Sequence, residues 1–453
     1  MPLDRSNLAP ALLIIACALL AYANSLPGSF QYDDFNVIVD EPAVHSWSAW
    51  WASMPGIRPL LKASYTLNWT LANRTLSFHL FNLLLHTLNG VMLYWLARHF
   101  FTNHGKLPEK AAGHAALLAA LLFTLHPANT EAVTYISGRS ISLTASFYLA
   151  AILCHLHSGR QPMLRWLGVA CFALALSVKE VGVTLPFALW LWSRGTSDRP
   201  AAHLWPYFTL LAAGLLLILL TPIYDRLVFY SLEHRSLSGN VPAAMAGVLY
   251  LAGKLFWPVG LSIDPDIVQL PADSILLRGE WLVLGLLIAL ALWHIRRPQG
   301  RWHTPAFALL WFVLHLLPTH SLIPRLDPAN DRQLYLAAIG PFFAIAYYLN
   351  RLWQAPAMPL RALPVLLLGL LAGATVARNH DYRSETQLWR SAAAIAPNKP
   401  RVLNNLGYAL AQEGQYCAAE RAYLTALHND PQFSIAAANL RNLRALPAAQ
   451  RSC

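Results

Sequence analysis

Long apolar stretches alternate along the chain with short polar connectors, and this pattern continues from about residue 8 to residue 377. A helix needs about 20 apolar residues to cross the roughly 30 Å hydrocarbon core of a bilayer. The stretches that come near this length are 8–23, 79–100, 114–127, 140–157, 163–178, 181–193, 204–221, 281–294, 304–318, 333–350 and 361–377. The pattern therefore predicts an all-α protein, a polytopic helical bundle with about eleven membrane spans.

The first of these stretches also fits a second interpretation. Arg5, an apolar run and the small residues AYA at 21–23 are typical of a secretory signal peptide with its cleavage site. Because many apolar stretches follow, the segment fits a first membrane helix equally well, and we interpret it in that way.

Basic residues in the connectors predict the orientation, since loops on the cytoplasmic side carry an excess of lysine and arginine. The five basic connectors contain Arg98, Lys106 and Lys110; Arg160 and Arg165; Arg194 and Arg199; Arg296, Arg297 and Arg301; and Arg351 and Arg361. All five lie on the cytoplasmic side only if the segment 242–258 does not cross fully, so we expect that segment to be re-entrant or interfacial. The N-terminus is then cytoplasmic and the C-terminus extracytoplasmic.

This topology predicts that the remaining polar loops share the outer face. They are the first outer loop 24–78, then 128–139, the Lys179–Glu180 turn, 222–280 and 319–332. Any chemistry that the chain performs is therefore expected on the extracytoplasmic side.

Composition agrees with a membrane protein. Of the 453 residues, 56% are hydrophobic and only 12% are charged, whereas soluble domains carry about 25% charged residues; the mean hydropathy is +0.40. The net charge of +11 is spread over the loops, which favours membrane orientation over binding of nucleic acid. The five cysteines form neither a disulfide framework nor a zinc motif.

A different period takes over after residue 377. Residues 400–433 match the 34-residue tetratricopeptide (TPR) pattern, with key positions at Leu403, Leu406, Gly407, Leu410, Ala419, Tyr423, Ala426 and Pro431. The sequence predicts two domains, a membrane domain over 1–377 and a TPR region over 378–453. Segments 384–397 and 436–446 look like a preceding partial repeat and a capping helix. So short an array is expected to pack on the membrane domain; whether it binds an acceptor protein or braces a loop stays open.

The first outer loop carries an acidic pair, Asp33 and Asp34, within FQYDDFNVIVDE at 30–41. A solvated helix end would explain these carboxylates without any function. Their aromatic and apolar neighbours, however, would desolvate a carboxylate and raise its pKa. A carboxylate beside the lipid headgroups can also take a proton from a hydroxyl, as a general base does. The tryptophan-rich segment that follows suits a helix in the membrane interface.

Cations stand at several outer helix ends, and each alone is explained as an interfacial anchor or an ion-pair partner. They are Arg58, Arg139, Lys179, Arg325 and Arg332. Together they could bind a phosphate and neutralise a phosphate leaving group. Glu131 and Arg139 are close in sequence, which predicts an ion pair between them.

Histidines supply the remaining candidates. His79, Asn82 and His86 share one face of a predicted helix, and His126 lies in HPANTEAVTY. In a membrane such residues form hydrogen bonds between helices more often than they bind metal. We predict supporting roles for His79, His126 and Glu131, and no metal site.

Taken in order, these motifs resemble a family over nearly the whole chain. They are FQYDD, RPL with Tyr65 downstream, FHLFNLLLH, HPANTEAVTYISGRS, DRQLY and YRSETQLWRSAAAIAPNKPRVLNNLGYAL. They resemble the transmembrane and TPR-repeat-containing protein O-mannosyltransferases, which have the C-type glycosyltransferase fold and use dolichyl-phosphate mannose. The order of the motifs carries this resemblance more than any single motif.

The resemblance implies roles for individual residues. Asp33 would be the catalytic base and Asp34 its neighbour, and a polyprenyl-phosphate sugar would enter from the membrane for an inverting transfer. Arg332, with Tyr335 in the same DRQLY motif, would face the lipid phosphate; the family more often has Glu-Arg where this chain has Asp331-Arg332.

Two departures from the family bear on the partners and the compartment. The TPR array is short, so docking of a protein or glycan acceptor there is one of two roles left open, beside bracing of a loop. The compact loops resemble bacterial members, which implies an inner membrane with the active face and the TPR region in the periplasm. Membrane lipids and the lipid-linked sugar are then the expected partners, with no nucleic acid. No cofactor is implied, and a divalent cation is left open because the two adjacent aspartates are the only candidate oxygen ligands.

Two other functions fit parts of the pattern. A non-catalytic membrane-anchored TPR scaffold for envelope, pilus or polysaccharide assembly would tolerate asparagine at Asp33 and Asp34. A transporter or flippase would place ionisable residues in mid-membrane, and the centres of the predicted spans are almost free of them.

Overall fold

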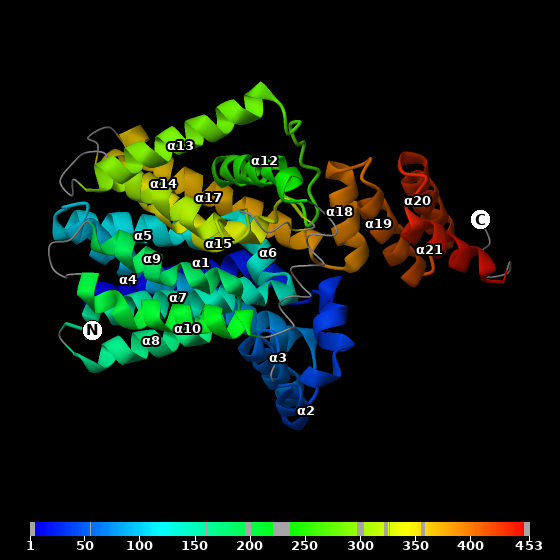
Figure 1. The fold of residues 1–453 in the computed structure, drawn as a ribbon, viewed down its shortest axis with the longest axis horizontal. Coiled ribbons are helices and arrows are strands. Elements are labelled where there is room, and N and C mark those ends of the chain that lie inside the picture. Colours follow the sequence, from blue (N-terminus) through cyan, green and yellow to red (C-terminus); the bar gives the residue numbers. More distant parts are fainter. Residues whose placement is uncertain are drawn as a thin grey trace.

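The computed structural model describes residues 5–54, 56–159, 161–194, 201–220, 236–296, 303–320, 325, 327–354 and 358–447. Throughout these residues the chain is helical and contains no strand, as the sequence predicts. The helices form an elongated bundle, and a smaller group of C-terminal helices extends from one end of it (Figure 1).

Every predicted apolar stretch falls on a helix. The bundle contains α1 (Arg5–Tyr22), α4 (Thr75–Asn103), α5 (Glu109–Leu125), α7 (Arg139–His157), α8 (Met163–Leu176), α9 (Leu185–Ser193), α10 (Trp205–Leu219), α13 (Ile275–Ile295), α14 (His303–Leu316), α15 (Leu334–Ala337), α16 (Ile339–Trp353) and α17 (Met358–Asp381). The segment predicted to be re-entrant is helical as well, as α12 (Leu237–Phe256).

The connections and the C-terminal part complete the fold. They contain α2 (Trp47–Ala52), α3 (Pro59–Leu71), α6 (Thr130–Val133), α18 (Glu385–Ile395), α19 (Pro400–Gln412), α20 (Tyr416–Asn429) and α21 (Ser434–Ala445). Short 3₁₀ turns are η1 (Ala23–Ser25), η3 (Pro42–Val44), η4 (Pro127–Asn129), η5 (Ile136–Gly138), η6 (Glu180–Thr184), η7 (Ala201–Leu204) and η8 (Asp331–Gln333), and η2 (Phe35–Val39) is a π turn.

The helices identify a membrane protein. Among the described residues, five helical stretches are long and apolar enough to cross a bilayer: Leu8–Ser25, Thr75–Asn103, Ile136–His157, Ile275–Ile295 and Leu360–Asp381. A sixth results if α5 and the segment Pro127–Val133, bent by 50°, form one broken span. Three further apolar helices are shorter. The total of about eleven crossings, and the path of α12, stay predictions.

The core of the bundle is rich in aromatic side chains. Phe100 of α4 packs against Phe307 of α14 and Phe343 of α16, with ring centroids 4.6 and 5.1 Å apart. Gly340 of α16 lies so close to α14 that an added Cβ would come within 2.6 Å of the Trp311 side chain. On the outside of the bundle, leucines of α13 and α17 such as Leu286 and Leu370 are exposed, as lipid-facing residues are.

The two ends of the bundle differ in the segments that meet there. At one end His104, after α4, lies 3.1 Å from His303 at the start of α14, and Arg165 of α8 contacts His203 at 2.9 Å. At the other end the first outer loop contacts Ser137 and η6, and α6 contacts η8. These are segments that the sequence assigns to opposite sides of the membrane, and the orientation itself stays a prediction.

Some of the predicted topology lies outside the described residues. This applies to Arg160, Arg199, Arg297 and Arg301 of the basic connectors, to residue 221 at the end of a predicted span, and, in the predicted outer loops, to 55, 222–235, 321–324 and 326.

The C-terminal helices lie where the 34-residue pattern places them. Helices α19 and α20 approach closely, because a Cβ at Gly407 of α19 would come within 2.7 Å of the buried Tyr423 ring of α20. Helices α18 and α21 coincide with the predicted partial repeat and cap. Assignment to the TPR class, and the boundary at residue 378, stay predictions.

Candidate active site

The acidic pair lies on a segment that is fixed at several points after α1. The Asn24 side chain donates to the Val376 carbonyl of α17 (2.8 Å) and accepts from Asn379 (2.9 Å). His79 of α4 bonds the Gly28 carbonyl at 3.2 Å. Tyr32, directly before the acidic pair, has a φ of +47°, a left-handed conformation that non-glycine residues rarely adopt. The surrounding structure therefore imposes the direction in which the two carboxylates leave the chain.

Asp34 is held inside the loop. Its side chain is buried, and its two oxygens accept hydrogen bonds from the Ser137 N–H (2.7 Å) and the Gln31 N–H (3.0 Å). Burial raises the pKa of Asp34 to about 7, although these two backbone donors lower it. With both oxygens occupied, Asp34 joins the acidic loop to the 133–139 segment.

Asp33 is placed differently. It is partly exposed, and its own N–H donates to the Tyr135 hydroxyl at 2.9 Å. Burial raises the pKa of the Asp33 carboxyl, while the Arg332 guanidinium and the Tyr135 hydroxyl lower it. A half-buried carboxylate with a raised pKa beside a cation is the environment expected of a general base.

The 133–139 segment keeps its place under the acidic pair through α4. The Asn82 side-chain amide donates to the carbonyls of Val133 and Ile136, both at 3.2 Å. Gly138 packs so tightly there that a Cβ would come within 2.0 Å of the Glu131 carbonyl oxygen. The predicted hydrogen bonding of Asn82 between segments is confirmed, and it positions both Tyr135 and the Ser137 N–H.

Arg332 of η8 is paired with Glu131, and its charge acts on the Asp33 carboxyl. The backbone N–H of Arg332 donates to Glu131 Oε2 at 3.1 Å, and the side-chain Nε of Arg332 lies 3.4 Å from Glu131 Oε1. Its neighbour Asp331 points elsewhere, accepting from the Tyr250 hydroxyl (2.9 Å) and the Ser262 N–H (3.1 Å). Glu131 therefore orients Arg332, and Asp331 anchors the loop that carries it.

Four cations act electrostatically on one another, and together we call Arg58, Lys179, Arg325 and Arg332 the basic cluster. Arg58 pairs with Glu180 at 2.8 Å, and Lys179 Nζ donates to Ser140 Oγ at 3.4 Å. Burial lowers the pKa of Lys179 well below its usual value, and the other three cations of the cluster lower it further. A bound anion such as a phosphate would offset the repulsion among these cations.

The structure does not bring Arg139 to this cluster. Its fully buried guanidinium donates to Asn82 Oδ1 (2.7 Å), the Ser64 carbonyl (3.0 Å) and the Phe78 carbonyl (3.1 Å). The predicted ion pair between Glu131 and Arg139 is wrong, because Glu131 pairs with Arg332 instead. Arg139 thus joins α3, α4 and α7 within the protein.

Tyr335 and His126 also lie away from the acidic pair. The buried Tyr335 hydroxyl contacts His86 Nδ1 at 2.8 Å and the Asn89 amide at 3.0 Å, in the interior of the bundle. His126 Nε2 bonds the Leu255 carbonyl at 3.2 Å, and its Nδ1 accepts from the Ala128 N–H at 3.3 Å. Both residues connect helices in this structure.

Sequence reasoning missed three residues near Asp33. Tyr135 lies within a quoted motif, HPANTEAVTYISGRS, but nothing distinguished it from an interfacial tyrosine. Asp327 and Arg401 both act electrostatically on the Asp33 carboxyl, although each lies more than 290 positions later in the chain. Only the fold brings these two residues to the acidic pair.

Two other features are separate from the site. Within the described ranges, no group of three or more His, Cys, Asp or Glu side chains is arranged to hold a metal ion.

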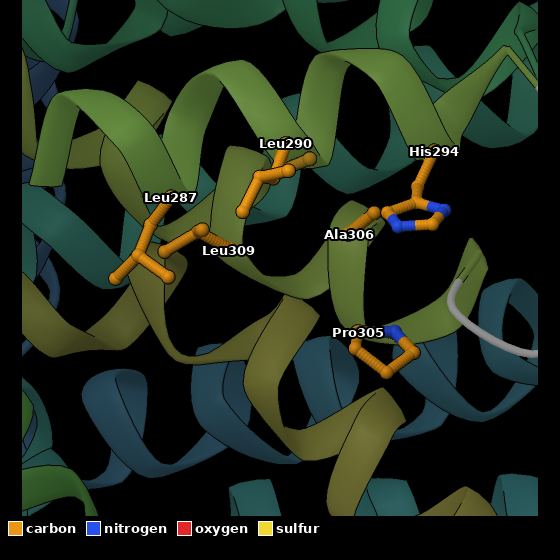
Figure 2. Close-up of a pocket in the computed structure, with 7 residues that line it drawn as sticks. Leu287, Leu290, His294, Pro305, Ala306 and Leu309 are labelled. Atoms are coloured by element: carbon orange, nitrogen blue, oxygen red, sulfur yellow. The ribbon is translucent and has the colours of Figure 1, made fainter. Parts of the chain in front are cut away.

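An apolar cavity of about 310 Å³ lies between α13 and α14, lined by leucines and alanines of both helices with His294 and Pro305 (Figure 2). None of the predicted site residues lines it.

The chain is similar to animal proteins named protein O-mannosyl-transferases. It is 25% identical to mouse TMTC3 over 94% of this chain and 51% of the relative, 26% identical to human TMTC4 (91% and 65%), and 26% identical to human TMTC1 (96% and 57%). The chain thus spans about half to two thirds of the length of these relatives. No family model matches it, and no solved structure matches it significantly. These relatives support the resemblance drawn from the sequence.

Proposed function

We propose that this chain is an integral-membrane glycosyltransferase. It moves a sugar from a polyprenyl-phosphate donor to a hydroxyl of an extracytoplasmic acceptor, protein or glycan, with inversion at the anomeric carbon. The observation that carries this proposal is the partly exposed Asp33 carboxyl beside Arg332 of the basic cluster, at one end of an apolar bundle. The names of the relatives make mannose the first sugar to consider.

Asp33 acts as the base in the proposed mechanism. Its carboxylate takes the proton from the acceptor hydroxyl as that oxygen attacks the anomeric carbon of the sugar. The bond between the anomeric carbon and the phosphate oxygen breaks, and its electron pair stays on the polyprenyl phosphate. Attack from the side opposite the leaving phosphate inverts the configuration.

The basic cluster stabilises the leaving phosphate. Negative charge develops on the phosphate oxygen as the glycosidic bond breaks, and fixed cations in a half-buried site lower the energy of that state. In this structure Arg332 pairs with Glu131, and Arg58 pairs with Glu180. Because the reacting groups stand at the end of the bundle, the polyprenyl chain can stay in the bilayer during transfer.

The compartment follows from the predicted topology. With the basic connectors in the cytoplasm, the acidic pair and the C-terminal helices face the periplasm of a bacterial inner membrane. The C-terminal helices, adjacent to the acidic loop, are then available to an acceptor protein or glycan.

The proposal is tested with purified protein in lipid bilayers and a panel of polyprenyl-phosphate sugars, starting with mannose. Wild type is expected to consume at least one donor, and Asp33→Asn to lose about 10²- to 10⁴-fold in rate, as expected on removal of a general base. Asp40→Asn, an exposed carboxylate of the same loop, is the matched control and should retain the wild-type rate. Equal rates for wild type and a folded Asp33→Asn variant would refute the catalytic assignment and favour the scaffold.

A further inference from the structure

The C-terminal helices contact the acidic loop directly. The Ser29 N–H donates to the Arg383 carbonyl (3.4 Å), and the Gln31 amide donates to the Tyr382 carbonyl. The Tyr32 ring meets Trp389 of α18 edge-on, with centroids 5.0 Å apart. The residue directly before Asp33 therefore packs against a helix that begins more than 350 positions later in the chain.

This contact supports an unfavourable backbone conformation. The φ of +47° at Tyr32 is a left-handed conformation, which is unfavourable in a residue that carries a Cβ. Such conformations persist only where the surroundings impose them, and they concentrate at functional sites. Trp389 and the Tyr382 carbonyl belong to those surroundings, so α18 contributes to the direction of the Asp33 side chain.

A network of charged residues forms a second contact. Lys399 Nζ lies 2.6 Å from Asp264 Oδ1, and Arg401 Nε donates to Asp264 Oδ2 at 2.6 Å. The Arg401 guanidinium also pairs with Asp327, five residues before Arg332 of the basic cluster. Arg401 thus connects α19 to the segment that carries Arg332.

We propose that α18 and α19 form one wall of the catalytic site, with Arg401 as a positioning residue whose ion pair with Asp327 sets the charge around Asp33. This inference rests on the proposed function, in which Asp33 is the base. It assigns the C-terminal helices a part in the chemistry, in addition to any docking of acceptors.

The charges around Asp33 give this role a measurable consequence. Four groups from other segments act electrostatically on the Asp33 carboxyl: Arg332 of η8, Tyr135, Asp327 before η8, and Arg401 of α19. On its own loop, Asp33 interacts with Asp34 and Tyr32. Arg401 lowers the pKa of Asp33, whereas Asp327 raises it. Removal of either charge breaks the same ion pair, yet the two removals change the pKa of Asp33 in opposite directions.

The experiment compares the pH dependence of kcat/KM for full-length variants in lipid bilayers. The deprotonated base is the active form, so activity falls as the pH drops through the pKa of Asp33. Arg401→Gln should move this acid limb to higher pH, and Asp327→Asn should move it to lower pH, each by about half a pH unit. Arg401→Lys retains the charge and should retain the wild-type acid limb even at a reduced rate.

Arg390→Gln is the matched control, because Arg390 is an exposed arginine on α18 whose side chain contacts Gln415, and it should leave both rate and pH profile unchanged. Acid limbs that stay in place, or move in the same direction in both charge variants, would overturn the positioning role. If Arg401→Gln does not fold, the direction in which the acid limb shifts in Asp327→Asn tests the proposal alone. Absence of any turnover in wild type would instead refute the proposed function.

Discussion

Substitution of Arg139 tests whether this arginine has a structural role, in contrast to the arginines of the basic cluster, which we assign to phosphate binding. Arg139→Met removes the donors to Asn82 Oδ1 and to the carbonyls of Ser64 and Phe78, all inside the protein. A buried acceptor that loses its partner costs about 1–3 kcal/mol. Methionine fills part of the volume among the aromatic rings, so we expect a net loss of about 3–5 kcal/mol in the free energy of unfolding.

Arg58→Met is the comparison. The Arg58 side chain is 38% exposed and its partner Glu180 45% exposed, and ion pairs of this kind contribute about 0–1 kcal/mol. This variant should keep its stability and bind polyprenyl phosphate more weakly.

The assay for both variants is reversible unfolding in mixed micelles, followed by tryptophan fluorescence, together with the affinity for polyprenyl phosphate. An Arg139→Met protein with the stability of wild type and a lost affinity would refute the reasoning, because the guanidinium would then bind the ligand.

Three further predictions follow from the site and the C-terminal helices. Wild-type kcat/KM should fall as the pH is lowered through the raised pKa of Asp33, so that the midpoint of the acid limb lies above the ordinary aspartate value of about 3.9; a midpoint at or below that value would contradict the burial of Asp33. Glu180→Gln removes the carboxylate that pairs with Arg58 and should tighten binding of polyprenyl phosphate about 5-fold, with a steeper dependence on salt; weaker binding would argue against a phosphate in the basic cluster. Gly407→Val should push α19 and α20 apart at Tyr423, lower the stability of the C-terminal helices by about 1–3 kcal/mol and speed their cleavage by added protease; unchanged cleavage would contradict the tight packing of this pair.

Apolar length was sufficient to place the helices, because any stretch that crosses a bilayer must satisfy its own backbone hydrogen bonds. Each predicted stretch falls on a helix, and the 34-residue period singled out Gly407 and Tyr423, which pack against each other. Helix boundaries shifted by a few residues, since hydropathy does not record caps or turns. The 333–350 stretch, for example, is divided between α15 and α16.

The part of the candidate site that lies in the predicted outer loops could be anticipated from the sequence. Arg58, Lys179 and Arg332 stand in loops that the topology brings to one end, and they meet there. Arg139 stands at the first position of α7, where a side chain can point into the bundle or out of it, and sequence does not record which. Arg401 pairs with Asp327 from a segment far away in the chain, a contact that no local pattern contains.

The most direct test of the account measures binding and transfer separately for one variant, Asp33→Asn, in lipid bilayers. The measurement is the affinity for the polyprenyl-phosphate sugar that wild type consumes, together with the rate of a single turnover to acceptor. If Asp33 is the base and the basic cluster holds the phosphate, the variant will bind the donor as tightly as wild type and transfer about 10²- to 10⁴-fold more slowly. A variant that transfers at the wild-type rate would contradict the account.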